Sequence, residues 1–147
     1  MQLRVQREAF DFGYEANNFA MAQSNMGAIV TFSGVVRNLE GIKLSYITIE
    51  HYPGMAEKAI AKIVDEAANR WSLGDVLVIH RYGCLAPGDL IMMVATASKH
   101  RKNAFEAAEY LMDYLKSRAP FWKKEVTDRS QDWITSKLED ETMLKRW

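Results

Sequence analysis

The strand-like segments of this 147-residue chain come in pairs, and a short turn rather than a helix joins the members of each pair. Residues 27–37 and 43–52, rich in β-branched and aromatic side chains, form the first pair. Residues 76–82 and 90–97 form the second pair, around the turn sequence APGD at 86–89. Because short connections join antiparallel neighbours, we expect hairpins and not a parallel sheet with helical crossovers.

Two long helices are predicted around the second strand pair. Residues 55–71 place apolar side chains on one face at helical spacing. The other helix is expected to begin with Ser98 as its N-cap and to continue to about Arg118, because Pro120 cannot extend a helix. A shorter strand and a shorter helix precede all of these segments. This order of elements predicts an α+β fold in which residues 1–147 form a single domain.

The overall charge of the chain is balanced. Lys plus Arg and Asp plus Glu each number 19, which argues against a protein that coats nucleic acid. Cys84 is the only cysteine and leaves no internal disulfide, which fits a reducing cytoplasm. The longest apolar run, 90–97, is far shorter than the ~20 residues that span a bilayer. We therefore expect a cytoplasmic protein that binds neither nucleic acid nor membrane.

A basic and aromatic segment ends the predicted second long helix. Within nine residues, 116–124, the chain places four cations and two large aromatic side chains around Pro120. Such a corner suits a flat, anionic small molecule, and neighbouring cations lower the pKa of a lysine and make its amine reactive. From the residues alone, Lys116 and Lys123 are either such a reactive pair or two ordinary solvated lysines.

His100 and Arg101 stand near the start of the same predicted helix. The free backbone N–H groups of a helix N-terminus, together with Arg and His, make an anion site, although such a pair can equally face solvent. Lys116 lies sixteen residues further along, about 24 Å away at roughly 1.5 Å per residue. One small-molecule site cannot use both ends of this helix. If both serve one pocket, we expect them to come from two chains of a dimer.

Other polar residues have simpler interpretations. Arg37 ends a predicted strand and is suited to phosphate recognition. Glu50 and His51 are adjacent in a strand, so their side chains point to opposite faces. No second histidine lies at metal-ligand spacing, and we expect no metal site. We interpret His80 as structural or interfacial and Cys84, which has no neighbouring cation, as incidental.

A series of short motifs matches one family in order and spacing. They are FSGVVRN at 32–38, EHYPGM at 50–55, HRYG at 80–83, PGD at 87–89, HR at 100–101 with AF at 104–105, MDYLK at 112–116 and PFWKKE at 120–125. Over about residues 27–133, the chain resembles the large, catalytic subunit of molybdopterin synthase. The resemblance rests on several separate motifs and not on any single one.

The resemblance implies an α/β-hammerhead type of α+β fold and a specific reaction. Members of that family convert cyclic pyranopterin monophosphate into molybdopterin by inserting two sulfur atoms, which form the dithiolene. The sulfur arrives as a thiocarboxylate on the C-terminal glycine of a small ubiquitin-like partner subunit. Two large subunits form a central homodimer with one small subunit at each end, which makes a heterotetramer. We expect no cofactor.

The resemblance also assigns roles to residues of this chain. It implies that Lys116 and Lys123 are catalytic. It implies substrate binding by Arg37, His100, Arg101, Met112 and Lys137, the last replacing an arginine of some relatives and lacking its planar fork. The alternative hypothesis is a non-catalytic module that docks a ubiquitin-like protein through the same basic corner. Docking alone needs no pterin pocket, and this argues for the enzyme.

Overall fold

The computed structural model describes residues 1–134 and 138–147. Two helices of 17 residues each, α2 and α3, are the longest of the described elements. None of the helices within these ranges has the length and hydrophobicity that crossing a bilayer requires. The elements in chain order are β1 (Gln2–Gln6), α1 (Phe12–Met21), β2 (Ala28–Val35), β3 (Leu44–His51), α2 (Met55–Trp71), β4 (Asp75–Arg81), β5 (Gly83–Leu85), β6 (Leu90–Ser98), α3 (Arg101–Ser117), β7 (Phe121–Thr127), β8 (Gln131–Ile134) and α4 (Leu138–Leu144).

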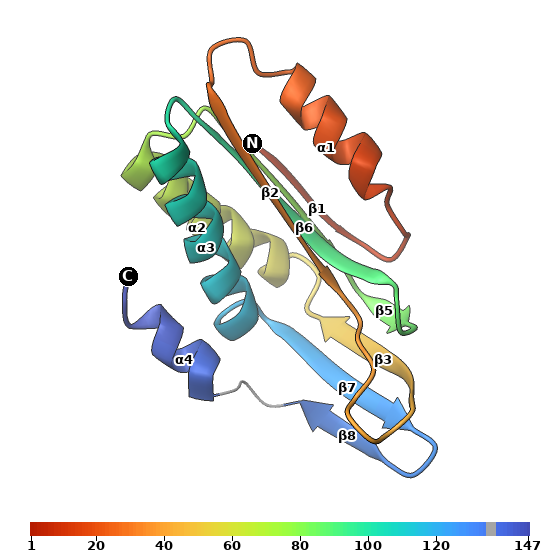
Figure 1. The fold of residues 1–147 in the computed structure, drawn as a ribbon. Helices are drawn as coiled ribbons and strands as arrows, with labels where there is room; N and C mark the ends of the chain where they lie inside the picture. The colour runs from red at the N-terminus through yellow and green to blue at the C-terminus, as the bar shows by residue number, and fades with distance from the viewer. Residues whose placement is uncertain (135–137) are drawn as a thin grey trace.

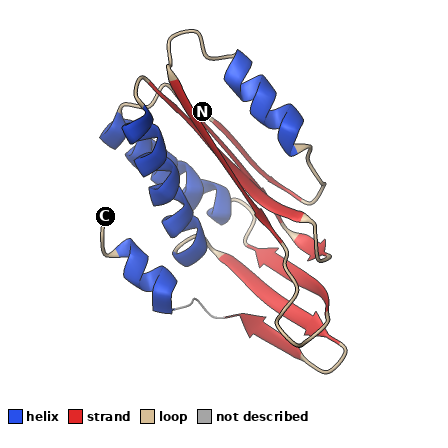
Figure 2. Cartoon of the chain, viewed as in Figure 1, coloured by secondary structure: helices blue, strands red, loops and turns tan. Residues whose placement is uncertain are grey.

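The strands form two four-stranded sheets, which Figure 2 shows in red. The first has the order β1-β4-β6-β2, in which β1 runs parallel to β4 and the other neighbours are antiparallel. The second has the order β5-β3-β7-β8 and is antiparallel throughout. The predicted α+β fold is therefore confirmed, as are its two main helices.

Helices lie on both faces of the first sheet (Figure 1). Successive residues of a strand point to opposite faces, so β4 sends Val78 to one face and Ile79 to the other. Val78 packs with buried residues of α2 and α3, such as Ile60 and Leu111. Ile79 packs with Phe19 of α1. The first sheet is thus buried on both sides, and this core fixes the end of α3 where the basic segment begins.

The predicted hairpin between residues 27–37 and 43–52 is wrong. β2 pairs with β6 in the first sheet, whereas β3 pairs with β5 and β7 in the second. The N–H of Val36, just after β2, donates to the carbonyl of Asp89, and the N–H of Gly88 donates to the carbonyl of Val36. These bonds tie the end of β2 to the turn before β6. The chain that follows therefore passes to the other sheet instead of folding back.

The second predicted strand pair is confirmed, because β4 and β6 are antiparallel neighbours. The helix after β6 begins later than predicted. Ser98 is the buried last residue of β6 and pairs with Ala28, so it is not the N-cap. His100, with an extended backbone, takes that position, although its side chain makes no capping hydrogen bond. The helix ends at Ser117, before Pro120, as predicted.

Candidate active site

Lys116 and Lys123 are brought together by a reversal of the chain after α3. Lys116 lies in the last turn of the helix, and Pro120, which cannot continue a helix, directly precedes β7. β7 then runs antiparallel to β3 in the second sheet. Because side chains alternate along a strand, Phe121, Lys123 and Glu125 share one face of β7, and all three line the same cavity as Lys116.

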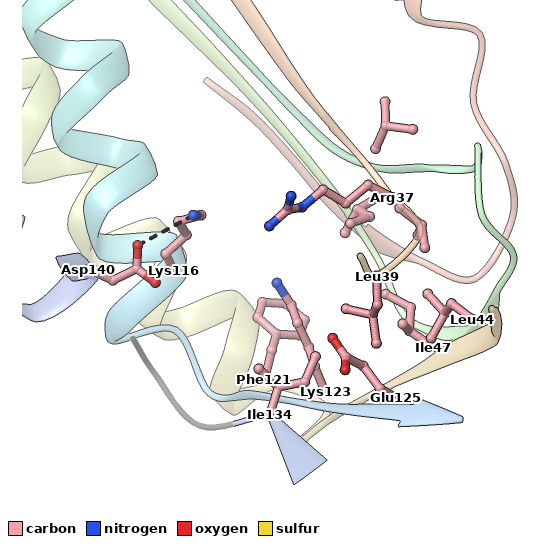
Figure 3. Close-up of a pocket in the computed structure, with 13 residues that line it drawn as sticks. Arg37, Leu39, Leu44, Ile47, Lys116, Phe121, Lys123, Glu125, Ile134 and Asp140 are labelled. Carbon is pink, nitrogen blue, oxygen red and sulfur yellow. Dashed lines mark hydrogen bonds and ion pairs between the residues drawn. The ribbon is translucent and has the colours of Figure 1, made fainter. Parts of the chain in front are cut away.

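This cavity has a volume of about 320 Å³. Arg37 just after β2, Lys116 at the end of α3 and Lys123 in β7 extend toward it from three separate elements (Figure 3). Glu125 and Asp140 add two carboxylates to its lining. Three cations around a largely apolar space fit a flat molecule that carries negative charge. The apolar part of the wall consists of Val35, Val36, Leu39, Leu44, Ile47, Ile91, Phe121 and Ile134.

Lys123 has a pKa below the ordinary value for lysine. Burial lowers the pKa most, because an ammonium group loses its hydration there, and the nearby charge of Lys116 lowers it further. Asp140 acts in the opposite direction. The crowding of cations expected from the sequence therefore acts on Lys123, with burial as the larger cause. A lowered pKa increases the fraction of neutral amine at a given pH, and a neutral amine can accept a proton.

Lys116 is about half exposed and pairs with a carboxylate from the C-terminal helix α4. Its Nζ lies 3.4 Å from Oδ1 of Asp140, the contact dashed in Figure 3. Nearby, Nη1 of Arg118 lies 2.8 Å from Oε1 of Glu141. Two carboxylates of α4 thus face two cations at the end of α3. Sequence reasoning missed this contact. The acidic residues at the start of α4 are visible in the sequence, but the sequence does not indicate which distant cations they contact.

The C-terminal residue is held against α2 and α3. The indole Nε1 of Trp147 donates a hydrogen bond of 2.6 Å to Oδ2 of Asp113, and Arg70 donates one of 3.0 Å to the backbone oxygen of Trp147. The indole ring also packs edge-on against Trp71 and Tyr110. The segment after α4 is therefore anchored one turn away from Lys116 on the same helix.

His100 and Arg101 lie at the opposite end of α3, and both are exposed. Neither lines the cavity of Lys116 and Lys123. One chain therefore does not bring together all the residues predicted for the site. Met112, one turn before Lys116, lines two adjoining cavities that also include Lys116. Lys137 lies outside the described residues.

An apolar groove of about 570 Å³ runs between β2 and α3. Phe32 and Phe105, two of its lining residues, are 43% and 62% exposed. β2 is also an edge strand of the first sheet, with backbone groups on its outer side that have no neighbouring strand among the described residues. Exposed apolar surface beside an open sheet edge is typical of a protein interface. Lys116 lies at one end of the groove, so the interface would adjoin the cavity.

Known proteins share both the sequence and the fold of this chain. The family described as MoaE protein matches residues 5–118. The molybdopterin synthase catalytic subunit of Cereibacter sphaeroides is 60% identical over the full length of both chains. That of Escherichia coli is 56% identical over 122 residues, 82% of this chain and 81% of the relative.

The fold comparison agrees with the sequence comparison. The solved structure of the molybdopterin biosynthesis MoaE protein from Burkholderia ambifaria has a TM-score of 0.85 and 43% identity, and the match covers 99% of this chain and 97% of that one. These findings confirm the resemblance predicted from the motifs. The chain therefore belongs to the MoaE family, the catalytic subunits of molybdopterin synthase.

Proposed function

We propose that this chain transfers sulfur from the C-terminal thiocarboxylate of a small ubiquitin-like subunit to cyclic pyranopterin monophosphate, forming the dithiolene of molybdopterin. The observation that carries the proposal is the convergence of Arg37, Lys116 and Lys123 on one cavity from three elements. The names of the similar proteins support the same reaction. The single cysteine favours a cytoplasmic location. The proposed reaction takes its sulfur from the partner subunit and therefore requires no thiol from this chain.

The two lysines suit different tasks. Lys123, with its lowered pKa, can supply a neutral amine that accepts a proton and returns it during sulfur transfer. Lys116 is more exposed, and its contact with Asp140 shows that a carboxylate fits beside its amine. We assign Lys116 to the thiocarboxylate of the partner tail and Lys123 to proton transfer at the reacting centre. Arg37 is suited to the phosphate of the substrate.

The alternative is a docking module that grips a carboxylate and performs no chemistry. Such a module needs exposed cations only, whereas Lys123 is largely covered and its pKa is lowered by that burial.

Reconstitution tests the proposal directly: the purified chain, a thiocarboxylated small subunit and cyclic pyranopterin monophosphate are mixed and molybdopterin is measured. Product that requires all three components supports the enzyme. A tight complex without product supports the docking module instead.

We propose further that two copies of the chain build each site. His100 and Arg101 lie at the far end of α3 from Lys116, so they reach a shared pocket only from a second copy. The groove between β2 and α3, with Phe32 and Phe105 exposed, offers an apolar surface for that copy. The partner's phosphate-binding pair would then complete the cavity, and one small subunit would dock at each end of the dimer.

Mixed dimers provide a quantitative test of this arrangement. Lys116→Ala chains and Arg101→Ala chains, each nearly inactive alone, are refolded or co-expressed together. If sites are shared, half of the dimers are mixed and each mixed dimer has one intact site, so activity recovers to about a quarter of wild type. If each site belongs to one chain, mixing restores nothing. The matched control mixes two batches of Lys116→Ala chains, which should stay inactive in either case.

A further inference from the structure

His80 lies beside the strand that carries Lys123. Its side chain is buried, with 2% of its surface exposed, and its ring stacks on Phe121 with centroids 3.8 Å apart and planes inclined by 12°. Phe121 precedes Lys123 by two residues on the same face of β7. The sequence suggested a structural or interfacial role for His80, and the ring stack agrees with packing. Packing on Phe121, however, would be served equally well by a ring without nitrogens, so it does not explain either ring nitrogen of His80.

The hydrogen bond of one ring nitrogen determines the state of the other. Nδ1 of His80 lies 2.9 Å from the carbonyl oxygen of Arg81. A carbonyl only accepts, so Nδ1 carries the hydrogen, and Nε2 of the neutral ring carries a lone pair. Within residues 1–134 and 138–147 the His80 ring makes no other hydrogen bond. Nε2 is therefore an acceptor available to a donor outside its own strand.

A small cavity is lined by the His80 side chain and by both lysines. It has a volume of about 150 Å³, and His80, Lys116 and Lys123 all line it. The rest of its lining is glycine or apolar, including Phe32, Ile91 and Met112. The His80 ring is thus the side chain in this wall that offers a nitrogen lone pair to the neighbouring amines. A space of this size also has room for a bridging water, which occupies about 30 Å³ in the liquid.

The surroundings keep the His80 ring neutral. Burial lowers its pKa to about 3, the charge of Lys123 and that of His51 act in the same direction, and the bond to the Arg81 carbonyl only partly opposes them. At neutral pH the ring therefore does not add another cation beside the lysines, and Nε2 keeps its lone pair. The other charged groups that line the neighbouring large cavity are Arg37, Lys116, Glu125 and Asp140.

We infer that His80 is a positioning residue: Nζ of Lys123 donates to a water in the small cavity, that water donates to Nε2 of His80, and the bridge holds the amine toward the larger cavity. The acceptor stabilises the ammonium form, so it prevents the pKa of Lys123 from falling even further on burial. His80 thereby sets both the direction and the protonation of the amine. The consequence for turnover rests on the proposed function, whereas the consequence for Lys123 itself does not.

Three variants separate this role from packing. His80→Phe keeps the ring stack on Phe121 and removes both nitrogens. His80→Asn places an amide near the position of Nδ1, so it can keep the contact with the Arg81 carbonyl only. His80→Gln places an amide near the position of Nε2. A role in packing alone is satisfied by Phe, which keeps the ring, whereas the proposed hydrogen bond is restored only by Gln. Asn and Gln both lack the ring and differ in which ring nitrogen their amide replaces. Circular dichroism and thermal melting establish which variants fold.

The first measurement is an NMR titration of the Lys123 side chain in the free chain, with no partner or substrate. We expect the Lys123 pKa to fall further in His80→Phe and His80→Asn and to return toward wild type in His80→Gln. An unchanged pKa in His80→Phe, or equal recovery in His80→Asn and His80→Gln, would overturn the inference. Because this readout needs no reaction, it stands even if wild type itself produces no molybdopterin, an outcome that would reject the proposed function alone.

The second measurement is steady-state kinetics in the reconstituted system. We compare kcat at a pH where Lys123 is neutral in both proteins, and there we expect kcat of His80→Phe to fall about tenfold, the effect of losing one hydrogen bond that orients the amine, with KM for the pterin changed less than about twofold. His80→Gln should recover most of kcat. A rise in KM at constant kcat in folded His80→Phe would contradict the inference, because it would indicate a change in the shape of the binding pocket.

Discussion

Lys116→Ala is expected to lower molybdopterin formation by at least about a hundredfold, the scale on which acid–base and anchoring groups contribute to enzymatic rates. The side chain is about half exposed at the end of α3, so its loss leaves no buried cavity. We therefore expect the thermal midpoint to stay within about 2 °C of wild type. Single-turnover assays with the thiocarboxylated partner measure the first effect, and calorimetry measures the second.

Lys124→Ala is the matched control for this experiment. Lys124 lies on the other face of β7 from Lys123, with its Nζ 5.6 Å from the ring centroid of Trp133, and it does not line the cavity. Its removal also takes away one cation from the same segment, but activity should stay within about twofold of wild type. Full activity of folded Lys116→Ala would rule out a catalytic role for Lys116. Equal losses in the two variants would show that net charge, not position, is what matters.

Lys123→Met is expected to lower kcat at least about tenfold and at the same time to raise stability at neutral pH. Burial lowers the pKa of Lys123 in the folded chain relative to the unfolded chain, so the unfolded state binds more protons between the two pKa values. Stability of wild type therefore increases with pH through that window, and the protonated lysine costs stability below it. Methionine fills the same space without a charge to bury.

The pH dependence distinguishes the variant from wild type. Wild-type kcat should rise with pH through the lowered pKa of Lys123, below the ordinary range for lysine, because the neutral amine is the active form. Lys123→Met should show no rise at that position, and its thermal midpoint should lose the corresponding pH dependence. Retained kcat with a weaker KM would make Lys123 a binding residue. A lower thermal midpoint in Lys123→Met would contradict the destabilising effect of the buried amine.

The elements predicted best are those whose burial follows a simple period. The apolar spacing from Met55 to Trp71 predicted α2 with the bounds that the structure has. The pairing of strands was harder to predict. β2 and β3 have the composition of a hairpin, but the backbone hydrogen bonds of Val36 with the 86–89 turn direct the two strands into different sheets. β7 was missed as a strand, since its inward residues include Lys123 and Glu125. A strand with charges facing a cavity does not show the usual apolar alternation.

The candidate site was predicted in its parts but not in its arrangement. Lys116, Lys123 and Arg37 were all named from the sequence, and the structure brings them to one cavity. That the more buried of the two lysines is Lys123 depends on the second sheet, which the sequence did not predict. Asp140 was missed for the same kind of reason, because an ion pair across 24 residues leaves no local pattern.

The anchored C-terminus makes α4 an intramolecular ligand for Lys116. β8 holds one end of the final segment through its pairing with β7, and Trp147 holds the other through Asp113. A carboxylate tethered at both ends, such as that of Asp140, remains at a high effective concentration, on the order of millimolar or above, beside the amine that it contacts. If Lys116 binds an anionic tail as we propose, that tail must displace Asp140 from the amine. The net binding free energy of such a tail at Lys116 is therefore its own contact energy minus the energy of the Lys116–Asp140 contact that it replaces.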